Sequence, residues 1–372
     1  MDFKNVNASL RAAGERVVRR PLQRALQQGY YATPLDFDRD RVVMLFYEDF
    51  DQDRMVRGDR HAIRFARQLV HLVRHGQKTT GFRVAYEALA RSLRLAGYTV
   101  VENDYALARA NPTYPIGVSG YPHVLTNWSL PNPTVIGPGL YDHPSQRPEL
   151  MNDRRFVSYI AHSKWVQDLF GATYKDACRI WFAGIDMDQW PDLSAQPKDL
   201  DFIVYDKIHW NQEQVRSELR WPLEAELKRR GLSSATLVYK RYDHAEYRAL
   251  LGRTRGMIFL SEHETQGLAY QEAMSTNVPI LAWDPGFWHD PVRFKYGAEH
   301  VATSSVPFFK DGVTGERFRD AVGMRPALDR FLAGRAGYTP RAFVREELSL
   351  QRSAETYLAL YREALQRGLS PS

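Results

Sequence analysis

The stretch that decides the fold runs from Phe259 to Trp283 and reads FLSEHETQGLAYQEAMSTNVPILAW. Its apolar beginning predicts a strand, the polar residues 261–266 a loop, Gly267 the start of a helix, and the apolar residues after Pro279 a second strand. In a parallel sheet, the loop that follows such a strand faces the ligand crevice. We therefore expect this loop and the beginning of the helix to contact a ligand.

Two glutamates, Glu264 and Glu272, flank the predicted helix start and are separated by seven residues. The free backbone N–H groups at a helix N-terminus stabilise a diphosphate, and the glycine at position 267 lets that anion approach closely. Glu272, about one and a half turns into the helix, is placed to accept hydrogen bonds from ribose hydroxyls. Glu264 on the loop is placed to reach a transferred sugar, so this arrangement suits a sugar nucleotide.

The same stretch resembles the Glu-x7-Glu signature of the retaining GT-B glycosyltransferases of family four, which run Glu-Gly-Phe-Gly-Leu, then Glu-Ala-Met-Ala, then Gly-x-Pro. The sequence departs from that pattern at Thr265 and Gln266, where glycine and an aromatic residue are usual, and at Ser275 and Asn277. We expect these departures to affect donor preference more than fold. The positions that match are Glu264, Gly267, Leu268, Glu272, Ala273, Met274 and Pro279.

Two further stretches resemble segments of the same family, and they follow one another along the chain as they do in that family. WFAGIDMDQW, residues 181–190, resembles the segment that closes the first domain, although Phe182 and Ala183 replace proline and asparagine. SLQRSAETYLALYREAL, residues 349–365, resembles the C-terminal helix that crosses back to the N-terminal domain. The resemblance implies an α/β protein of the GT-B class, with two Rossmann-like domains facing a cleft. The expected parts are an acceptor-side domain over 1–190, a nucleotide-sugar domain over 191–349 and the returning helix over 350–372.

Alternating strand and helix patterns along the chain agree with two such domains. In the first half, strands are expected at residues 42–47, 98–102, 133–139, 155–163 and 179–184, and helices at 84–95 and 164–170. The proline-rich residues 189–199 read as the linker. In the second half, strands are expected at 201–207, 235–240 and 256–262, and helices at 212–230, 245–254 and 350–366.

Basic residues that hold the donor diphosphate come, by this resemblance, from the ends of the first two strands of the second domain. These ends read VYDK and VYKRY, which places Lys207, Lys240 and Arg241 there. Lys207 matches the family's strand-end arginine with a shift of one residue. A leaving diphosphate gains charge in the transition state, and fixed cations in a dry cleft stabilise it. The alternative for each of the three is a solvated surface side chain.

The N-terminal domain is expected to supply the acceptor side. Residues 76–82, GQKTTGF, resemble the family's glycine loop, whose backbone lies near the donor phosphate or the acceptor; they contain Gly76, Lys78 and Gly81. His143 follows the strand-like PTVIGPG, near where several members carry a histidine beside the donor sugar. We expect His143 to be catalytic because the pKa of histidine is tunable near neutrality. The competing histidines are His123 and His162.

The resemblance implies a metal- and cofactor-independent hexosyltransferase that uses a nucleotide-diphosphate sugar and a glycan or lipid-linked acceptor. Retention of configuration would follow from front-face departure and attack, in which the leaving phosphate helps to deprotonate the acceptor. Synthesis of cell-surface polysaccharide or glycoconjugate is the expected role. Two alternatives with the same fold stay open, because fold does not decide function. They are a non-catalytic module that binds sugar nucleotides or glycans, and a sugar-nucleotide epimerase.

An acidic segment imitates a different class of glycosyltransferase. Asp49, Asp51 and Asp53 follow a strand-like run and resemble the Asp-x-Asp site with which GT-A enzymes hold Mg²⁺ or Mn²⁺ on a diphosphate. A GT-A interpretation leaves the paired glutamates and the terminal helix unexplained. No cluster of histidine and cysteine indicates zinc either. We therefore expect no metal.

Composition places the chain among globular proteins of the reducing cytoplasm. Of 372 residues, 44% are hydrophobic and 25% charged, a single cysteine (Cys178) has no partner, and no apolar run approaches the ~20 residues of a membrane span. The net charge of +6 favours polyanionic partners, but no nucleic-acid motif accompanies it. The N-terminal arginines predict either a solvated helix or peripheral contact with the anionic inner membrane face. These arginines are Arg11, Arg16, Arg19, Arg20 and Arg24.

Overall fold

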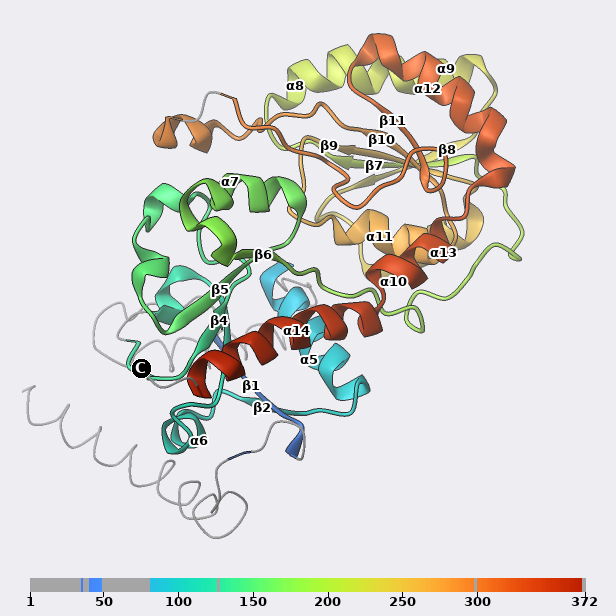
Figure 1. The fold of residues 1–372 in the computed structure, drawn as a ribbon. Coiled ribbons are helices and arrows are strands. Elements are labelled where there is room, and N and C mark those ends of the chain that lie inside the picture. The colour runs from blue at the N-terminus through green and yellow to red at the C-terminus, as the bar shows by residue number, and fades with distance from the viewer. Residues whose placement is uncertain (1–34, 36–39, 49–80, 126–127, 298–299, 370–372) are drawn as a thin grey trace, which may run out of the picture.

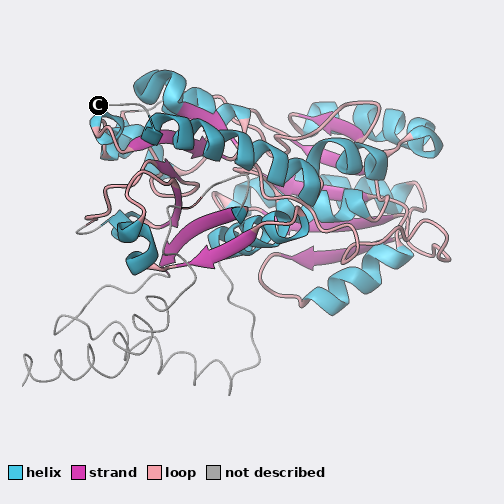
Figure 2. Cartoon of the chain, turned by 60° about the horizontal axis from the view of Figure 1, so that its bottom comes forward, coloured by secondary structure: helices cyan, strands magenta, loops and turns pink. Residues whose placement is uncertain are grey.

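The computed structural model describes residues 35, 40–48, 81–125, 128–297 and 300–369. Within them the chain forms two α/β domains, each built on a parallel sheet (Figure 1). The sequence predictions at Gly76, Lys78, the three aspartates 49, 51 and 53, and the N-terminal arginines lie outside the described residues. Figure 2 shows the strands of the sheets between helices.

The N-terminal sheet has the strand order β2-β1-β3-β4-β5-β6. Strand β1, between β2 and β3, is an apolar run whose residues 42–47 are buried, as expected of a parallel strand covered on both faces. Helix α5 buries Ala85, Leu89 and Leu93 and leaves its charged side chains to solvent. The element bounds are β1 Val42–Glu48, α5 Gly81–Leu95, β2 Thr99–Glu102, α6 Tyr105–Ala110, β3 Ile116–Gly120, β4 Thr134–Ile136, β5 Phe156–Ala161, α7 Lys164–Tyr174 and β6 Cys178–Ile180.

The C-terminal sheet has the order β11-β10-β9-β7-β8 and separates two hydrophobic cores. Successive residues of β7 and β9 point into opposite cores. Tyr205 of β7 and Phe259 of β9 pack with α11, whereas Val204 and Ile258, their neighbours in the chain, pack with α9 and α12. The bounds are β7 Phe202–Lys207, α8 Gln212–Val215, α9 Trp221–Arg229, β8 Ser234–Val238, α10 His244–Arg253, β9 Met257–Ser261, α11 Leu268–Ser275, β10 Ile280–Trp283, β11 Gly315–Phe318, α12 Ala321–Gly334, α13 Pro340–Phe343 and α14 Leu350–Leu369.

Helix α14 returns to the N-terminal domain, where it packs on α5, β4 and β5 (Figure 1). The buried indole of Trp181 donates to the Ser353 carbonyl at 3.0 Å, and the Tyr361 hydroxyl accepts the Met44 N–H at 3.0 Å. Gly117 makes room for this helix, because a Cβ there would lie 1.9 Å from the Tyr357 hydroxyl. The predicted fold class, including the returning helix, is confirmed, whereas the domain boundaries stay a prediction.

The strands and helices that the sequence predicted are present among the described residues, but several bounds differ, and the strand expected over 133–139 covers only Thr134–Ile136. The strand expected over 179–184 covers only Cys178–Ile180, and the helix expected over 212–230 contains a π-helical turn at Arg216–Arg220. The sequence analysis did not predict β3 and β11, because IGVSG is small and glycine-rich and GERF is polar. Among the described residues, no helix is long and apolar enough to cross a membrane.

Candidate functional site

The carboxyl ends of β7 and β9 lie side by side at the centre of the C-terminal sheet. In the sheet, β8 lies on one side of β7 and β9 on the other, so the order of the strands reverses at β7. The carboxyl ends of β7 and β9 are therefore the topological switch point, where parallel sheets bind ligands. Lys207 ends β7, and Glu264 lies in the loop after β9. Their side chains meet here, with Lys207 Nζ 2.6 Å from Glu264 Oε1.

Glu264 is held in a fixed orientation. It is only 9% exposed, its Oε1 accepts a hydrogen bond from the Ser261 hydroxyl at 3.0 Å, and its backbone N–H donates to the Ser304 carbonyl at 2.9 Å. Trp165 of α7, in the other domain, donates its indole N–H to the Glu264 carbonyl at 2.8 Å. The Lys207 ammonium also lies over the ring of Tyr239, 4.6 Å from its centroid. Both charged groups are therefore preorganised at the interface between the domains.

Gly267 begins α11 in a conformation that favours glycine. Its φ is +85°, and a Cβ there would lie 2.2 Å from Tyr270 Cε1. No side chain of the described residues caps the helix, and its first turn contains no acidic residue. Leu268 packs against the cores of both domains, which fixes this helix end at the domain interface. The open N-terminus therefore presents backbone donors and a partial positive charge to an anion.

Glu272 lies further along α11 and is partly buried. Burial raises the pKa of Glu272 to about 8, and the positive charge of Arg248 opposes this rise. Among the described residues, no side chain or backbone group forms a hydrogen bond or ion pair with the Glu272 carboxylate. A desolvated carboxyl group with unused acceptor capacity is suited to bind hydroxyl groups of a ligand.

Lys240 and Arg241 follow β8, the strand next to β7. Both are exposed, and neither forms an ion pair within the described part of the chain. Lys240 has a φ of +65°, and its ammonium lies 5.2 Å from the centroid of the Tyr239 ring. With Lys207 they place three cations at the ends of two neighbouring strands, and their role in holding a diphosphate, which the family resemblance implied, stays a prediction.

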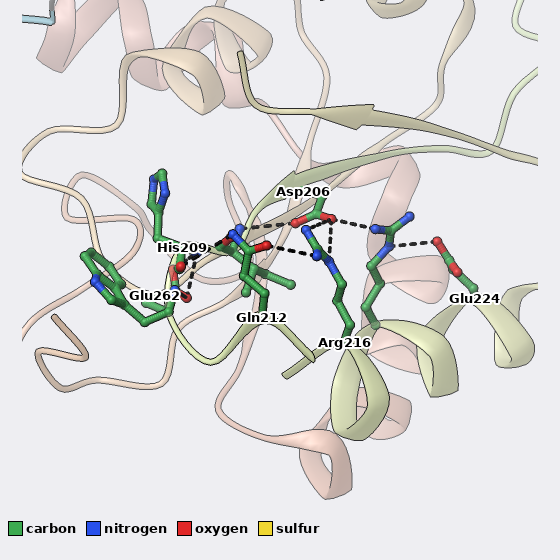
Figure 3. A network of polar contacts seen from close by, with 9 residues as sticks. Asp206, His209, Gln212, Arg216, Glu224 and Glu262 are labelled. Atoms are coloured by element: carbon green, nitrogen blue, oxygen red, sulfur yellow. Dashed lines mark hydrogen bonds and ion pairs between the residues drawn. The ribbon is translucent and has the colours of Figure 1, made fainter. Parts of the chain in front are cut away.

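The loop after β7 is fixed by a network of carboxylates that the sequence analysis missed (Figure 3). Glu262 accepts the backbone N–H groups of His209 at 2.9 Å and Trp210 at 3.0 Å, and Asp206 pairs with Arg220 at 2.5 Å. The Trp210 ring then stacks on His263, with centroids 5.1 Å apart and planes at 9°. The available sequence signal was a glutamate directly after a buried strand, two residues before Glu264.

His143 lies at the domain interface but is occupied with local structure. Its Nδ1 accepts the Ser145 N–H at 3.2 Å, so it caps the short helix Pro144–Gln146, and its ring stacks on Tyr296 of the other domain at 4.7 Å. Partial burial lowers the pKa of His143. These contacts give His143 a structural role at the interface between the domains, and a catalytic role for His143 stays a prediction.

The other sequence-predicted residues of the N-terminal domain are dispersed. Gly81 begins α5, and a Cβ at this position would have no atom of the described residues within 4 Å, apart from its chain neighbours and its own helix. His162 follows β5 and is buried, which lowers its pKa to about 4. His123 belongs to the 3-10 helix Pro122–Leu125, and its side chain lies outside the described structure.

A pocket of about 230 Å³ lies between the two domains. The N-terminal domain contributes Tyr141, His162 and Trp165, and the C-terminal domain contributes His263 and Thr265, which flank Glu264 in the chain, together with Trp288. The sequence analysis missed the aromatic residues because nothing in their spacing along the chain indicates that these loops meet. Within the described residues, no group of three or more His, Cys, Asp or Glu side chains is placed to hold a metal ion.

No protein-family model matches the chain, and no curated protein sequence matches it. Solved structures do. A glycosyltransferase from Rickettsia africae ESF-5 superposes with a TM-score of 0.55 and 12% identity, over 88% of this chain and 99% of its own. The chain has the GT-B fold. AviGT4, a glycosyltransferase involved in avilamycin A biosynthesis, shares this fold with a TM-score of 0.50 and 13% identity, over 87% of this chain and 98% of its own. TarM gives a TM-score of 0.50 and 12% identity over 69% of this chain and 56% of its own.

Proposed function

We propose that this chain is a retaining glycosyltransferase that moves a hexose from a nucleotide-diphosphate donor to a glycan or lipid-linked acceptor. The observation that carries the proposal is the ion pair between Lys207 and Glu264, 2.6 Å apart at the switch point of the C-terminal sheet. This pair lies at the edge from which α11 presents its uncapped N-terminus. A GT-B protein with these groups in its cleft suits transfer from a sugar nucleotide.

In this proposal the donor diphosphate lies at Gly267 and is neutralised by Lys207, Lys240 and Arg241. The helix N-terminus and the cations supply hydrogen bonds and positive charge to the leaving group. Glu272 accepts hydrogen bonds from the ribose hydroxyls, which use the acceptor capacity that no described residue fills. On donor binding, Lys207 exchanges Glu264 for phosphate, which frees the Glu264 carboxylate to face the transferred sugar.

The proposed reaction is a front-face displacement. The bond between the anomeric carbon and the diphosphate oxygen breaks, and an acceptor oxygen forms a bond to the same face of that carbon. The acceptor's proton passes to the departing phosphate oxygen. Glu264 stabilises the positive charge that develops on the sugar, and the cations stabilise the charge on the phosphate. Two structural neighbours are named as glycosyltransferases, which supports this class of reaction.

The proposal is tested with a panel of UDP, GDP and dTDP sugars. We expect one nucleotide diphosphate to raise the Tm of the protein, because a ligand that binds the folded state stabilises it. With an acceptor alcohol, the matching nucleotide sugar should give a glycoside of the donor's anomeric configuration, detected by NMR. Stabilisation without transfer or donor hydrolysis would instead identify a binding module. Conversion of the donor sugar without an acceptor would identify an epimerase.

We also propose a cytoplasmic location, with the N-terminal arginines in contact with anionic lipid at the inner membrane face, and a role in cell-surface polysaccharide or glycoconjugate synthesis. The membrane contact rests on the sequence alone, through Arg16, Arg19 and Arg20. Replacing these three by glutamate should lower co-flotation with phosphatidylserine vesicles and leave donor hydrolysis unchanged. Equal flotation of the variant would show that the arginines are a solvated face.

A further inference from the structure

The pocket between the domains is placed to hold a ring beside the proposed transfer site. His263 and Thr265 line it on either side of Glu264 in the chain, and Trp165 both lines it and donates to the Glu264 carbonyl at 2.8 Å. Most of the other lining residues belong to the N-terminal domain, at the ends of β4 and β5 and on α7. A ligand in this pocket therefore lies beside the loop that carries Glu264, mostly against the N-terminal domain.

The walls of the pocket are aromatic. The rings of Trp165 and Trp288 stand edge-on to His263, at centroid distances of 6.0 and 6.3 Å and interplanar angles of 87° and 81°. Flat side chains of this kind, with a few polar groups among them, bind ring-shaped ligands that have an apolar face. The C–H faces of a pyranose fit this description.

Two imidazoles of the pocket each have a buried ring nitrogen that no described residue hydrogen-bonds. His162 is 7% exposed and lines the pocket. No described residue forms a hydrogen bond with its Nδ1 or with the Nδ1 of His263. Burial lowers the pKa of His162 to about 4 and that of His263 to about 3, so both rings are neutral at pH 7. Unpaired buried nitrogens of this kind are rare and are satisfied by a ligand or an ordered water.

The charged groups of the pocket are all of one sign. Asp142 and Asp290 line it from opposite domains, and no lysine or arginine is among its described lining residues. Asp142 is close enough to Asp290 that, besides burial, the neighbouring negative charge raises its pKa. As far as the described residues go, an anionic ligand would meet like charge here with no cation to pair with it.

We propose that this pocket binds the acceptor as a sugar ring that carries no phosphate or carboxylate, and that an amino group on the ring strengthens binding through Asp142 and Asp290. The ring stacks on Trp288 and Trp165, and its hydroxyls lie beside the neutral imidazoles of His162 and His263. The assignment of this ring as the acceptor rests on the proposed function. It divides the cleft into a cationic donor side and an anionic acceptor side.

The test uses matched sets of probes: the methyl glycosides of glucose, galactose and mannose, their 2-amino forms and their 6-phosphates. Binding is measured by saturation-transfer NMR and by tryptophan fluorescence. We expect at least one sugar to bind, its amino form to bind more tightly, and its phosphate to bind at least tenfold more weakly. Equal or tighter binding of a 6-phosphate, or no binding of any probe, would overturn the inference.

Substitutions of pocket residues test whether the sugars bind in this pocket. Trp288→Ala should weaken binding at least tenfold. The double variant D142N/D290N keeps side-chain oxygens, including the Asp290 oxygen that accepts the Val292 N–H at 2.8 Å, but removes both charges. It should abolish the advantage of the amino sugar and reduce the discrimination against phosphate. Asp176→Asn, at an exposed position at the end of α7, is the matched control and should change neither. Unchanged selectivity in the double variant would contradict the role of the two carboxylates.

Donor chemistry keeps the two proposals separate. If the protein cleaves a nucleotide sugar but binds the 6-phosphates best, the pocket inference fails and the proposed function stands. If neutral and amino sugars bind as expected but no nucleotide sugar is bound or cleaved, the proposed function fails, and with it the assignment of the ring as an acceptor.

Discussion

The side-chain amide of Gln266 forms two hydrogen bonds with the backbone of Ala183, accepting its N–H at 2.8 Å and donating to its carbonyl at 2.7 Å. Ala183 lies between the last strand of the first sheet and the first strand of the second, and both residues are buried. Gln271 completes the arrangement, since its Oε1 accepts from Gln266 Nε2 at 3.0 Å. The loop that carries Glu264 is thus tied to the connection between the domains.

Removing this amide should destabilise the protein. Gln266→Leu leaves the N–H and carbonyl of Ala183 buried without partners, which we expect to lower the free energy of unfolding by about 1–3 kcal/mol. Urea denaturation measures this change. Gln351→Ala, in which an exposed hydrogen bond on α14 is lost, is the control and should change stability by less than about 0.5 kcal/mol. A similar small change in both variants would show that the Gln266 amide does not stabilise the interface.

Gln266 also shows what the sequence could and could not predict. Strand and helix patterns located β7, β9 and α11, because apolar periodicity and glycine positions are local signals. The same reasoning linked the departure at Gln266 to donor preference, whereas the side chain contacts Ala183, 83 positions away. Contacts of this kind, like the meeting of Trp165 with Glu264, depend on how two domains face each other, and spacing along the chain does not indicate them.

Lys207 should matter for both stability and donor binding. Lys207→Met leaves the Glu264 carboxylate without its cation in a mostly buried site, so we expect a loss of stability and a donor affinity at least tenfold weaker. Calorimetry with the nucleoside diphosphate measures the second effect. Lys228→Met, on the exposed side of α9, is the matched control and should leave both unchanged. Donor affinity unaltered by Lys207→Met would remove Lys207 from the diphosphate site.

Donor binding should depend on pH through Glu272. Burial raises the pKa of Glu272 to about 8, so the carboxyl is mostly neutral at pH 6 and must lose a proton before it accepts hydrogen bonds from two hydroxyls. Affinity should therefore increase from pH 6 through the pKa near pH 8 and level off about one pH unit above it. The side chain of Glu272→Gln cannot titrate, so this variant should lack the increase. Any pH dependence that the variant still shows reports protonation of the nucleotide itself. The same pH profile in both proteins would show that Glu272 does not bind the donor.

Transfer should survive chelation of divalent metals. The cations at the ends of β7 and β8 and the N-terminus of α11 are proposed to neutralise the diphosphate, which leaves no charge that a metal must supply. We expect the rate to be the same with and without EDTA after extensive dialysis. Activity that EDTA abolishes and Mn²⁺ restores would contradict the proposed mechanism and favour a role for Asp49, Asp51 and Asp53.

The two glutamates of the signature should differ in the kinetic step that they affect. Glu272 is proposed to bind ribose hydroxyls that do not change as the glycosidic bond breaks, so Glu272→Gln should mainly raise KM for the donor. Measured above pH 8, where the Glu272 carboxyl is charged, the expected loss is about 1.5–3 kcal/mol, the range for a hydrogen bond to a charged group.

Glu264 is proposed to face the anomeric carbon, where positive charge develops, so its carboxylate stabilises the transition state more than the ground state. Glu264→Gln keeps the size of the side chain and an oxygen for the Ser261 hydroxyl, which now donates to it at 3.0 Å, but removes the charge. It should therefore lower kcat with a smaller effect on KM. Steady-state kinetics of both variants with one donor and one acceptor separate these effects. If both variants raise KM equally and leave kcat unaltered, Glu264 binds the donor without acting on the reacting sugar, because a group that stabilises only the transition state must change kcat.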